Sequence, residues 1–550
     1  MAFEYRRATR SQDGTGRSLD MPTNLVLSIS HRKTSLTTHE FVDSTNHIQQ
    51  LPLELLHAIL ELVLFREEDE GWFRSEPRYH SVMLVCRDWA EIASNIWWKT
   101  RQYINPEAEA PLASLARLPL QRQQWYADKI QHLDLNETDA PDFIAALRLD
   151  FPSLKTLKVT QWMDCGIGFV CLASQIINRS LLELKLLRAY RTDDILTALL
   201  NAPNLRTLEL SCEIPDATSD KLLNAMQTCI QLRVLELSFS IEAVITKDVL
   251  AAIASLPYLT RLHLPCGELT FEATNYVLAT NTFPFRSITH LDLENFHSTA
   301  IDLLVGIPSL RSLSLGVIGT APILQVLATL CNLQDLELRF RDSVAIGYSQ
   351  WECLARLECL RRISIASWID FGFSQVDLSS ITTGEYISFF QAMPQLSGFW
   401  INAEISNTAE LYIKAGEICK NLESLGLRGQ IVLSMILESH TGGEPLYPML
   451  ESLWVYQFIE PQDEHTWDER IDNPALLLCK AAPKLWAVHS GTQIIQEQDH
   501  GLKPLVTECD NFAACVEERH YPMRQQEKTQ RLYEKYGKNM HSGMPIGTYV

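Results

Sequence analysis

The stretch NLRTLELSCEIPDATSDKLLNAMQTCIQLRVLEL, residues 204–237, contains the pattern that decides the fold. It opens with the apolar triplet Leu205, Leu208 and Leu210, and a triplet of the same internal spacing begins 27 residues later at Leu232. Successive side chains of an extended strand point to opposite faces, so Leu208 and Leu210 share one face. A single short strand cannot bury that face alone, and the repetition therefore predicts strands that stack on one another.

The triplet recurs from Ile130 to Leu485, a span of 355 residues in 13 steps. The mean step of about 27 residues lies inside the range of leucine-rich repeats. The fold class is therefore predicted to be α/β: a leucine-rich-repeat solenoid, with a curved parallel sheet and convex helices. Longer steps after Leu360 and Leu450 indicate inserted loops. The copies are Ile130/Leu133/Leu135, Leu154/Leu157/Val159, Leu181/Leu184/Leu186, Leu205/Leu208/Leu210, Leu232/Leu235/Leu237, Leu259/Leu262/Leu264, Ile288/Leu291/Leu293, Leu310/Leu313/Leu315, Leu333/Leu336/Leu338, Leu360/Ile363/Ile365, Leu396/Phe399/Ile401, Leu422/Leu425/Leu427, Leu450/Leu453/Val455 and the decayed Leu485/Val488.

The segments between triplets carry helical patterns. Residues 219–230 and 246–256 place apolar side chains at spacings of three and four, which is typical of a helix with one buried face. Several connections end in a proline just before the next triplet, as at Pro203 and Pro257. Proline ends a helix and favours extended backbone before it, so each such segment is predicted to be a helix that returns to the next strand.

The composition of the chain indicates which kinds of partner and which cellular compartment to expect. The 550-residue chain has a formal charge of −20, which disfavours nucleic acid, and no run of about 18 apolar residues predicts a membrane span. The 13 cysteines are scattered and form no zinc-binding pattern, so they are expected to be buried, reduced thiols of a cytoplasmic or nuclear protein.

Residues 51–98, in front of the repeats, form a different kind of segment. The first part, from Pro52, places Leu55, Leu56 and Ile59 on one face of a predicted helix. A polar stretch follows, and a second predicted helix carries Val85 and Trp89.

This segment resembles the F-box family. The match consists of Leu51-Pro52, Glu54-Leu55-Leu56, Ile59, the run LVCRDW at 84–89 and Trp97/Trp98, although the loop between its halves is longer than in the family. The resemblance implies binding to a Skp-type adaptor and, through it, to a cullin–RING scaffold. The alternative is a helical cap over the open end of the solenoid. The side chains expected to contact the adaptor are Leu51, Pro52, Leu55, Ile59, Leu84, Val85 and Trp89.

The expected organisation has five parts. Residues 1–48 are predicted to be disordered, 49–98 to form the F-box-like helical domain and 99–128 to form a linker or helical cap. Residues 129–490 are predicted to form the solenoid of about 14 repeats. Residues 491–550 are expected to be a C-terminal cap and mobile tail, with a helix near 521–536.

A target protein is expected on the concave face of the sheet. The middle position of each triplet strand faces that surface, where acidic residues occupy central repeats and tryptophans occupy later ones. Exposed aromatic side chains are good anchors for a partner. They are also surfaces that the inserted loops or the tail could cover. The candidate target-binding residues are Trp400, Trp454, Tyr456, Glu209, Glu236, Asp292 and Glu337.

The sequence contains no phosphate-binding loop, zinc-protease motif, nucleophile elbow or kinase signature, so no catalytic, cofactor or metal site is predicted. The expected function is the non-catalytic substrate-recognition subunit of an SCF-type ubiquitin ligase, with an unknown protein as target. One alternative is a leucine-rich-repeat scaffold for protein–protein interaction without a ubiquitin role. Another is a GTPase activator, which needs a projecting arginine such as Arg339 or Arg428.

Overall fold

The structure is a computed structural model. It describes residues 52–64, 82, 85–100, 115, 118–135, 149–160, 176–187, 194–211, 214, 217–237, 239–265, 271–319, 323–367, 376–403, 405, 408–432, 444–459, 481–485 and 487–490. The predicted segments 1–48 and 491–550, including the helix near 521–536, lie outside these residues.

The chain divides into two compact units, Met1–Arg66 and Glu67–Val550. The described element of the first unit is helix α2 (Leu53–Leu64). The second unit contains α4 (Arg87–Thr100), α6 (Leu120–Ala127) and the whole repeat region. The boundary falls inside the predicted domain 49–98, so that domain remains a prediction.

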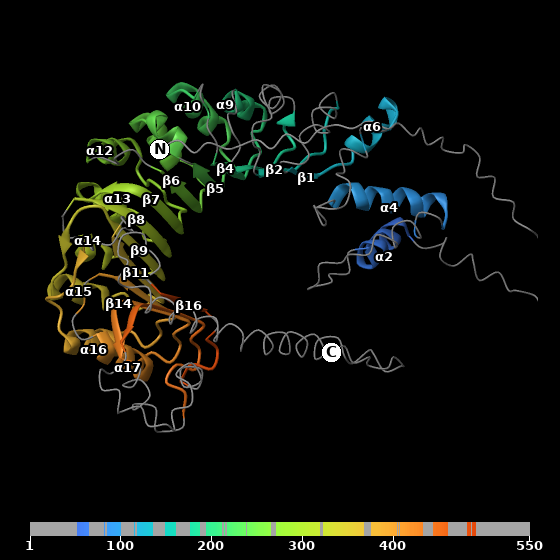
Figure 1. The fold of residues 1–550 in the computed structure, drawn as a ribbon. Coiled ribbons are helices and arrows are strands. Elements are labelled where there is room, and N and C mark those ends of the chain that lie inside the picture. Colours follow the sequence, from blue (N-terminus) through green and yellow to red (C-terminus); the bar gives the residue numbers. More distant parts are fainter. Residues whose placement is uncertain are drawn as a thin grey trace, which may run out of the picture. The chain divides into compact units, whose positions relative to one another are not determined.

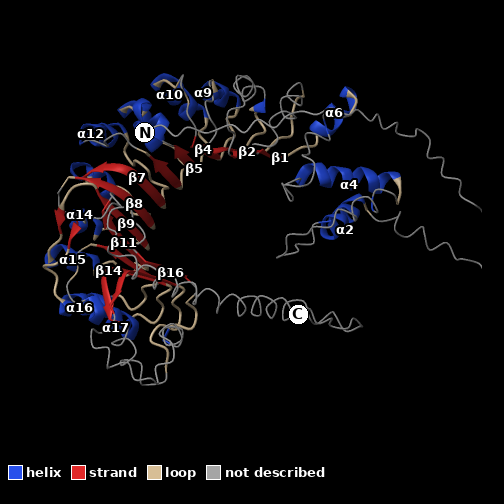
Figure 2. Cartoon of the chain, viewed as in Figure 1, coloured by secondary structure: helices blue, strands red, loops and turns tan. Residues whose placement is uncertain are grey.

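The repeat region contains one parallel sheet of 14 strands whose spatial order follows the chain order (Figures 1 and 2). Every predicted triplet contributes one strand, so the stacked-repeat prediction is confirmed, including the decayed last copy. The strands are β1 (His132–Leu135), β2 (Thr156–Thr160), β3 (Glu183–Leu187), β4 (Thr207–Ser211), β5 (Val234–Leu237), β6 (Arg261–Leu264), β7 (His290–His297), β8 (Ser312–Ile318), β9 (Asp335–Phe340), β11 (Arg362–Ser367), β13 (Gly398–Asn402), β14 (Ser424–Val432), β15 (Ser452–Ile459) and β16 (Ala487–Ser490).

Helices return along the outer side of the sheet (Figure 1). The predicted helices at 219–230 and 246–256 are confirmed as α10 and α11. The helices of the repeat region are α9 (Ile195–Ala198), η3 (Leu199–Asn201), α10 (Ser219–Thr228), η4 (Phe239–Val244), α11 (Lys247–Ala254), α12 (Phe271–Thr280), η5 (Ser298–Ala300), α13 (Asp302–Val305), α14 (Ile323–Leu327), α15 (Tyr348–Leu354), α16 (Thr383–Ala392) and α17 (Thr408–Ile418).

Threonine side chains fix where several of these helices begin. The Thr218 hydroxyl accepts a hydrogen bond from the backbone N–H of Lys221 at the start of α10, and Thr246 does the same for α11. At α16, Thr382 and Glu385 form a reciprocal capping box. Each cap satisfies a backbone N–H that has no partner inside the helix.

The core lies between the sheet and the outer helices. Leu208 and Leu210 of β4 are both fully buried, and the triplet residues of the other repeats whose side chains the structure describes join them in one continuous apolar cluster. Burial of an aliphatic side chain stabilises a fold by about 1.5–3 kcal/mol. The cluster runs from Leu115 to Leu485 and is built from neighbouring repeats, as expected for a stacked architecture.

Polar side chains at the turns before the strands tie successive repeats together. The side-chain amide of Asn204 donates to the carbonyl of Arg179 at 2.9 Å, and that of Asn332 donates to the carbonyl of Pro308 at 2.9 Å. The backbone adds bonds of the same kind, such as the N–H of Arg233 to the carbonyl of Arg206. These bonds satisfy carbonyl groups that the turns leave outside the sheet.

A second, two-stranded sheet pairs β10 (Val344–Ala345) with β12 (Val376–Asp377). Its second strand lies within the longer step after Leu360, where the sequence predicted only an inserted loop. Among the helices of the described residues, none has the length and hydrophobicity that a membrane crossing requires.

The described cysteines are free thiols. Cys229 and Cys419 are buried, and burial raises the pKa of each thiol to about 12. Cys331 and Cys359 are exposed, so the expectation of buried thiols holds for only part of the described set.

Candidate interaction surfaces

Helix α2 exposes one side of its apolar surface and buries another. Leu56 and Leu60 are 6% and 1% exposed, whereas Leu55 and Ile59 are 52% and 41% exposed. Leu55 and Ile59 are four residues apart and therefore share a helix face. Sequence alone did not separate these two roles, because all four side chains are apolar.

Three further predicted adaptor residues, Pro52, Val85 and Trp89, are among the described residues. Pro52 is exposed and its carbonyl accepts the first helical hydrogen bond of α2, from Leu56. Val85 is 58% exposed and Trp89 is half-buried. The remaining two predicted contacts, Leu51 and Leu84, lie outside the described residues.

The middle positions of the strands form one row across the inner face of the sheet. Strand register pairs these positions one after another. Six of the seven predicted target-binding residues occupy the row, and Tyr456 follows Trp454 by two residues on β15. The row contains Asp134, Lys158, Lys185, Glu209, Glu236, His263, Asp292, Ser314, Glu337, Ser364, Trp400, Gly426, Trp454 and His489.

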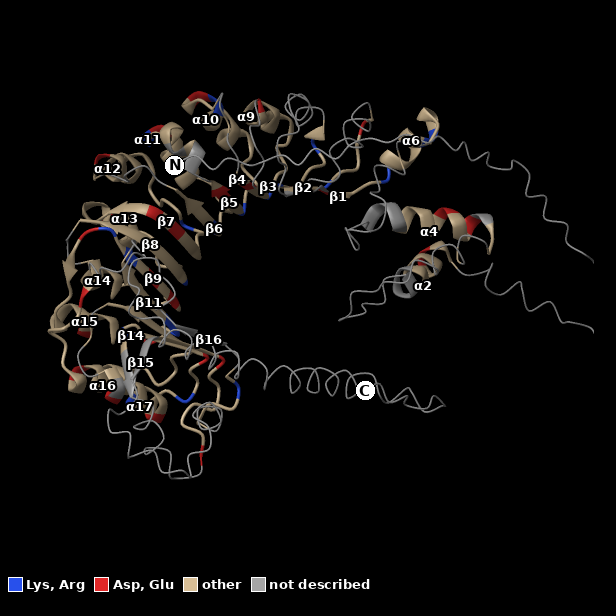
Figure 3. Ribbon diagram, viewed as in Figure 1, with Lys and Arg blue, Asp and Glu red and all other residues tan. Residues whose placement is uncertain are grey.

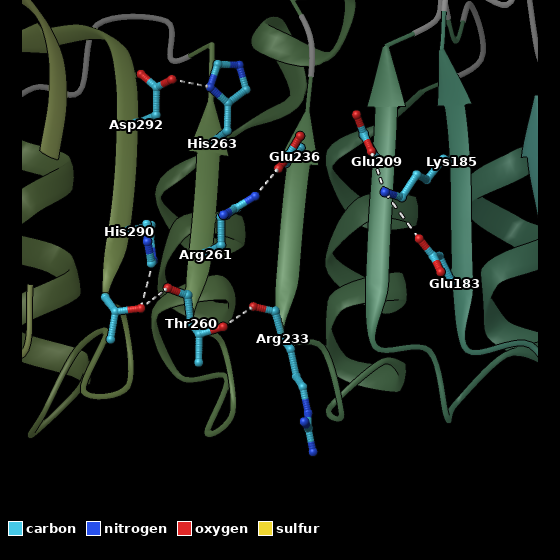
Figure 4. A network of polar contacts seen from close by, with 11 residues as sticks. Glu183, Lys185, Glu209, Arg233, Glu236, Thr260, Arg261, His263, His290 and Asp292 are labelled. Carbon is cyan, nitrogen blue, oxygen red and sulfur yellow. Dashed lines mark hydrogen bonds and ion pairs between the residues drawn. The ribbon is translucent and has the colours of Figure 1, made fainter. Parts of the chain in front are cut away.

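The acidic residues of this row are paired with basic residues of the same face, and Figure 4 shows the pairs of Glu209, Glu236 and Asp292. Three basic partners, Lys158, Lys185 and His263, are members of the row themselves. The other two, Arg261 and Arg339, lie two residues away from a middle position along a strand. Exposed pairs of this kind contribute about 0–1 kcal/mol each. The pairs are Asp134–Lys158 at 3.1 Å, Glu209–Lys185 at 3.5 Å, Glu236–Arg261 at 3.9 Å, Asp292–His263 at 2.9 Å and Glu337–Arg339 at 2.8 Å.

His263 lies between two carboxylates. Its Nδ1 is 2.9 Å from Asp292 and its Nε2 is 3.7 Å from Glu294. The hydrogen bond with Asp292 raises the pKa of His263 above its usual value, and the charges of Asp292, Glu294 and Glu236 outweigh the opposing effect of burial. Burial raises the pKa of the Glu294 carboxyl, while the His263 charge lowers it.

The His263 contacts predict a pH-dependent contribution to stability. A raised folded-state pKa means that the contribution is complete below the unfolded pKa of about 6.5 and is lost as pH rises through the folded pKa. His263→Gln should therefore destabilise the protein most at acidic pH, by about 1.5 kcal/mol, since charge-assisted hydrogen bonds contribute this order of energy. Urea unfolding from pH 5.5 to 8.5 measures the difference.

Replacing His290 is the control, because the opposite dependence of stability on pH is expected for it. Burial and the charge of Arg261 lower the pKa of His290, so its neutral form is favoured in the folded protein. The stability difference between wild type and His290→Gln should therefore fall as pH falls. A pH-independent effect of His263→Gln would contradict the proposed ion pairing.

Two tryptophans form an aromatic pair over a glycine in the later repeats. Trp400 of β13 and Trp454 of β15 flank Gly426 of β14, and their rings are 5.8 Å apart in an edge-to-face arrangement at 65°. A Cβ atom at Gly426 would lie 2.1 Å from Cδ1 of Trp400 and 3.1 Å from Cβ of Trp454. The missing side chain of Gly426 therefore lets the Trp400 ring lie across β14.

Both tryptophans are partly exposed. Tyr456, the third predicted aromatic residue, belongs to β15, but its side chain lies outside the described residues. We call Trp400, Gly426 and Trp454 the tryptophan platform.

Two observations decide the fold: the strands are parallel and follow the chain order, and the described triplet residues are buried beneath them. It is a leucine-rich-repeat solenoid. No protein-family model matches the chain, and no curated protein matches it significantly. Among solved structures, an internalin from Listeria monocytogenes is similar, with a TM-score of 0.37, 15% identity, 66% of this chain and 88% of that chain covered. A chain in the crystal structure of the Rad7 and Elc1 complex in yeast is also similar, with a TM-score of 0.35, 15% identity and coverages of 72% and 87%.

The buried side chain of Tyr412 connects α17 to strands β14 and β15, which carry two residues of the tryptophan platform. The hydroxyl of Tyr412, on α17, lies 3.1 Å from the carbonyl of Leu427 and 3.0 Å from that of Trp454, and it accepts a hydrogen bond from the N–H of Leu427. These contacts lie beside the register irregularity between Leu427 and Gln430. The sequence analysis did not single out Tyr412, because the groups that its hydroxyl contacts belong to the backbone.

Replacing Tyr412 with phenylalanine is expected to lower the free energy of unfolding by about 1–3 kcal/mol, because buried backbone groups lose their partner. Chemical denaturation measures the change. Tyr258→Phe is the matched control: Tyr258 is 51% exposed, so its effect should stay within about 0.5 kcal/mol. Equal unfolding midpoints for Tyr412→Phe and wild type would contradict this role.

The GTPase-activator alternative requires a projecting arginine on the inner face of the solenoid. Arg339 does not project freely, because its Nε donates to Glu337 at 2.8 Å, and this bond raises the pKa of the guanidinium. Arg428 lies on β14 beside the platform. Within the part of the chain that the structure describes, no group of three or more metal-binding side chains gathers.

Proposed function

We propose that the chain is the substrate-recognition subunit of an SCF-type cullin–RING ubiquitin ligase. In this proposal, α2 and the residues around α4 bind a Skp-type adaptor, and the concave face of the solenoid binds the target protein. The observation that supports it best is the exposed pair Leu55 and Ile59 on α2, next to the buried Leu56 and Leu60. Large apolar side chains grouped on a surface are typical of a protein-binding site.

The proposed mechanism is proximity. The chain contributes no reacting group: one surface holds the ligase scaffold, and the other holds the target. Tethering raises the local concentration of the target's lysines near the ubiquitin-conjugating enzyme, an effect that reaches the millimolar range for short connections. The fold suits this role, because a solenoid presents a long inner surface on a rigid repeat core.

A scaffold without a ubiquitin role is the second candidate. The tryptophan platform supports it, because such a surface binds a partner whether or not α2 engages an adaptor. The two candidates differ only in what contacts Leu55 and Ile59.

Co-expression of the full chain with a Skp-type adaptor tests the proposal. The expected result is a stable complex that elutes as a single species in size-exclusion chromatography. An established F-box protein, expressed with the same adaptor, is the positive control. If that control forms a complex and this chain elutes alone, the ligase proposal is wrong and the scaffold remains.

A further inference from the structure

The turns that lead into strands β3 to β8 carry basic side chains along one edge of the sheet. The strands are parallel, so these turns lie side by side at the amino ends of the strands. No aspartate or glutamate occurs in their described residues, 176–182, 199–206, 228–233, 254–260, 281–289 and 305–311. Five exposed arginines occur there, and we call them the arginine edge: Arg179, Arg206, Arg233, Arg286 and Arg311.

Backbone hydrogen bonds fix the arginine edge as a continuous line of turns. The N–H of Arg233 donates to the carbonyl of Arg206 at 2.7 Å, and the N–H of Thr260 donates to the carbonyl of Arg233 at 2.8 Å. Adjacent strands lie about 4.8 Å apart, so the line from β3 to β8 is about 24 Å long. The arginines therefore form an extended array and not a single compact cluster.

The guanidinium groups of the arginine edge are available to a ligand. Among the residues that the structure describes, none of the five arginine side chains has a hydrogen bond or an ion pair. Figure 4 shows the Arg233 side chain extending past the amino ends of the strands, away from the ion pairs of the inner face. Glu183, the acidic residue at the start of β3, is instead paired with Lys185 at 3.2 Å.

Acidic residues of the outer helices lie at the opposite edge of the solenoid (Figure 3). Asp220, Asp248 and Glu272 occupy the first turns of α10, α11 and α12, where the positive end of the helix dipole favours a negative side chain. Each helix then runs back toward the turn before the next strand. The arginine edge is thus locally positive, although the whole chain carries −20.

Exposed apolar side chains lie in the same turns as the arginines. A Cβ atom at Gly306 would lie 3.9 Å from Cγ of Pro284, so two of these turns pack directly against each other. Grouped apolar side chains are typical of a protein-binding surface, and arginine is enriched in such surfaces. The apolar residues are Leu200, Ile230, Tyr258, Phe283 and Val305, which are 43%, 50%, 51%, 73% and 51% exposed.

We infer that the arginine edge binds an extended segment of a partner protein in which acidic residues are interspersed with aliphatic ones. Guanidinium groups bind carboxylates through two parallel hydrogen bonds, and the aliphatic side chains cover the exposed apolar residues. Nucleic acid is disfavoured, because leucine, isoleucine and valine offer its bases no stacking surface and the charge of −20 repels a phosphate backbone. The edge lies outside the row of middle positions, so this site is additional to the target surface proposed above.

Three fluorescent probes test the inference by anisotropy on the full-length chain. The first is a peptide of about nine residues, long enough to span the edge, in which glutamates are interspersed with leucines. The second has glutamine in place of each glutamate, and the third is a single strand of DNA of the same number of nucleotides. The glutamate peptide is expected to bind at least about tenfold more tightly than either, with an affinity that falls as salt is added.

Two double variants separate a specific site from a general effect of charge. Arg206→Glu with Arg233→Glu should weaken binding of the glutamate peptide by at least about tenfold, and both side chains are exposed, so the protein should fold normally. Arg122→Glu with Lys247→Glu makes the same change in net charge at exposed positions of α6 and α11, and its affinity should stay close to that of wild type.

Three results would overturn the inference. They are no binding of the glutamate peptide, equal or tighter binding of the glutamine peptide or the DNA, and equal losses of affinity in the two double variants. The assay contains no adaptor, so its outcome is independent of the ligase proposal.

Discussion

Replacing Trp351 with alanine is expected to lower the free energy of unfolding by about 3–5 kcal/mol. Trp351, on α15, is fully buried and packs against the rings of Tyr386, Phe389 and Phe399, with centroids 5.3, 4.8 and 6.3 Å away. Alanine removes the centre of this cluster and leaves a cavity between repeats. Chemical denaturation followed by circular dichroism measures the loss.

Two controls make this prediction specific. Trp351→Phe retains an aromatic ring, and the Nε1 of Trp351 has no hydrogen-bond partner, so this variant should lose much less stability than alanine. Phe283→Ala, in an exposed loop, should change stability by no more than about 0.5 kcal/mol. A loss below about 1 kcal/mol for Trp351→Ala would mean that the aromatic cluster is not packed as described.

The paired substitution Leu55→Asp and Ile59→Asp is expected to weaken binding to a Skp-type adaptor by at least about 100-fold. Each apolar anchor in the centre of an interface contributes about 2–4 kcal/mol, and a change of 1.4 kcal/mol alters affinity tenfold. Both side chains are substantially exposed in the free chain, so charged replacements should leave the fold intact. Isothermal titration calorimetry with the purified adaptor gives the affinity.

Phe283→Asp is the matched control for this prediction, because it places the same charge at another exposed apolar position. Its affinity for the adaptor should equal that of wild type, and all three proteins should share one unfolding midpoint. Wild-type affinity in the Leu55→Asp/Ile59→Asp protein would remove α2 from the interface.

The repeat architecture was predictable because each strand carries its own local signal. A triplet such as Leu205, Leu208 and Leu210 specifies an extended segment with one apolar face, and regular spacing specifies that successive strands adjoin. Even the weak copy at Leu485 and Val488 forms β16, since the preceding strand provides the edge on which it pairs. The small β10–β12 sheet carries no such repetition and was not predicted.

The candidate surfaces were predictable as positions but not as interactions. The sequence placed Glu236 and Asp292 on the inner face, yet their pairing with Arg261 and His263 depends on side-chain reach across strands. Gly426 was not singled out in the sequence analysis, because a glycine at a middle position offers no side chain to a partner. Its contact with the Trp400 ring arises from stacking of separate repeats, which no local pattern encodes.

The most direct test of the account is hydrogen–deuterium exchange of the full chain with and without a Skp-type adaptor. The account predicts slower exchange in α2 and around Val85 and Trp89, while peptides that contain Trp400 and Trp454 remain unchanged. Protection of the inner strands with none in α2, under conditions where the adaptor protects an established F-box protein, would contradict the account.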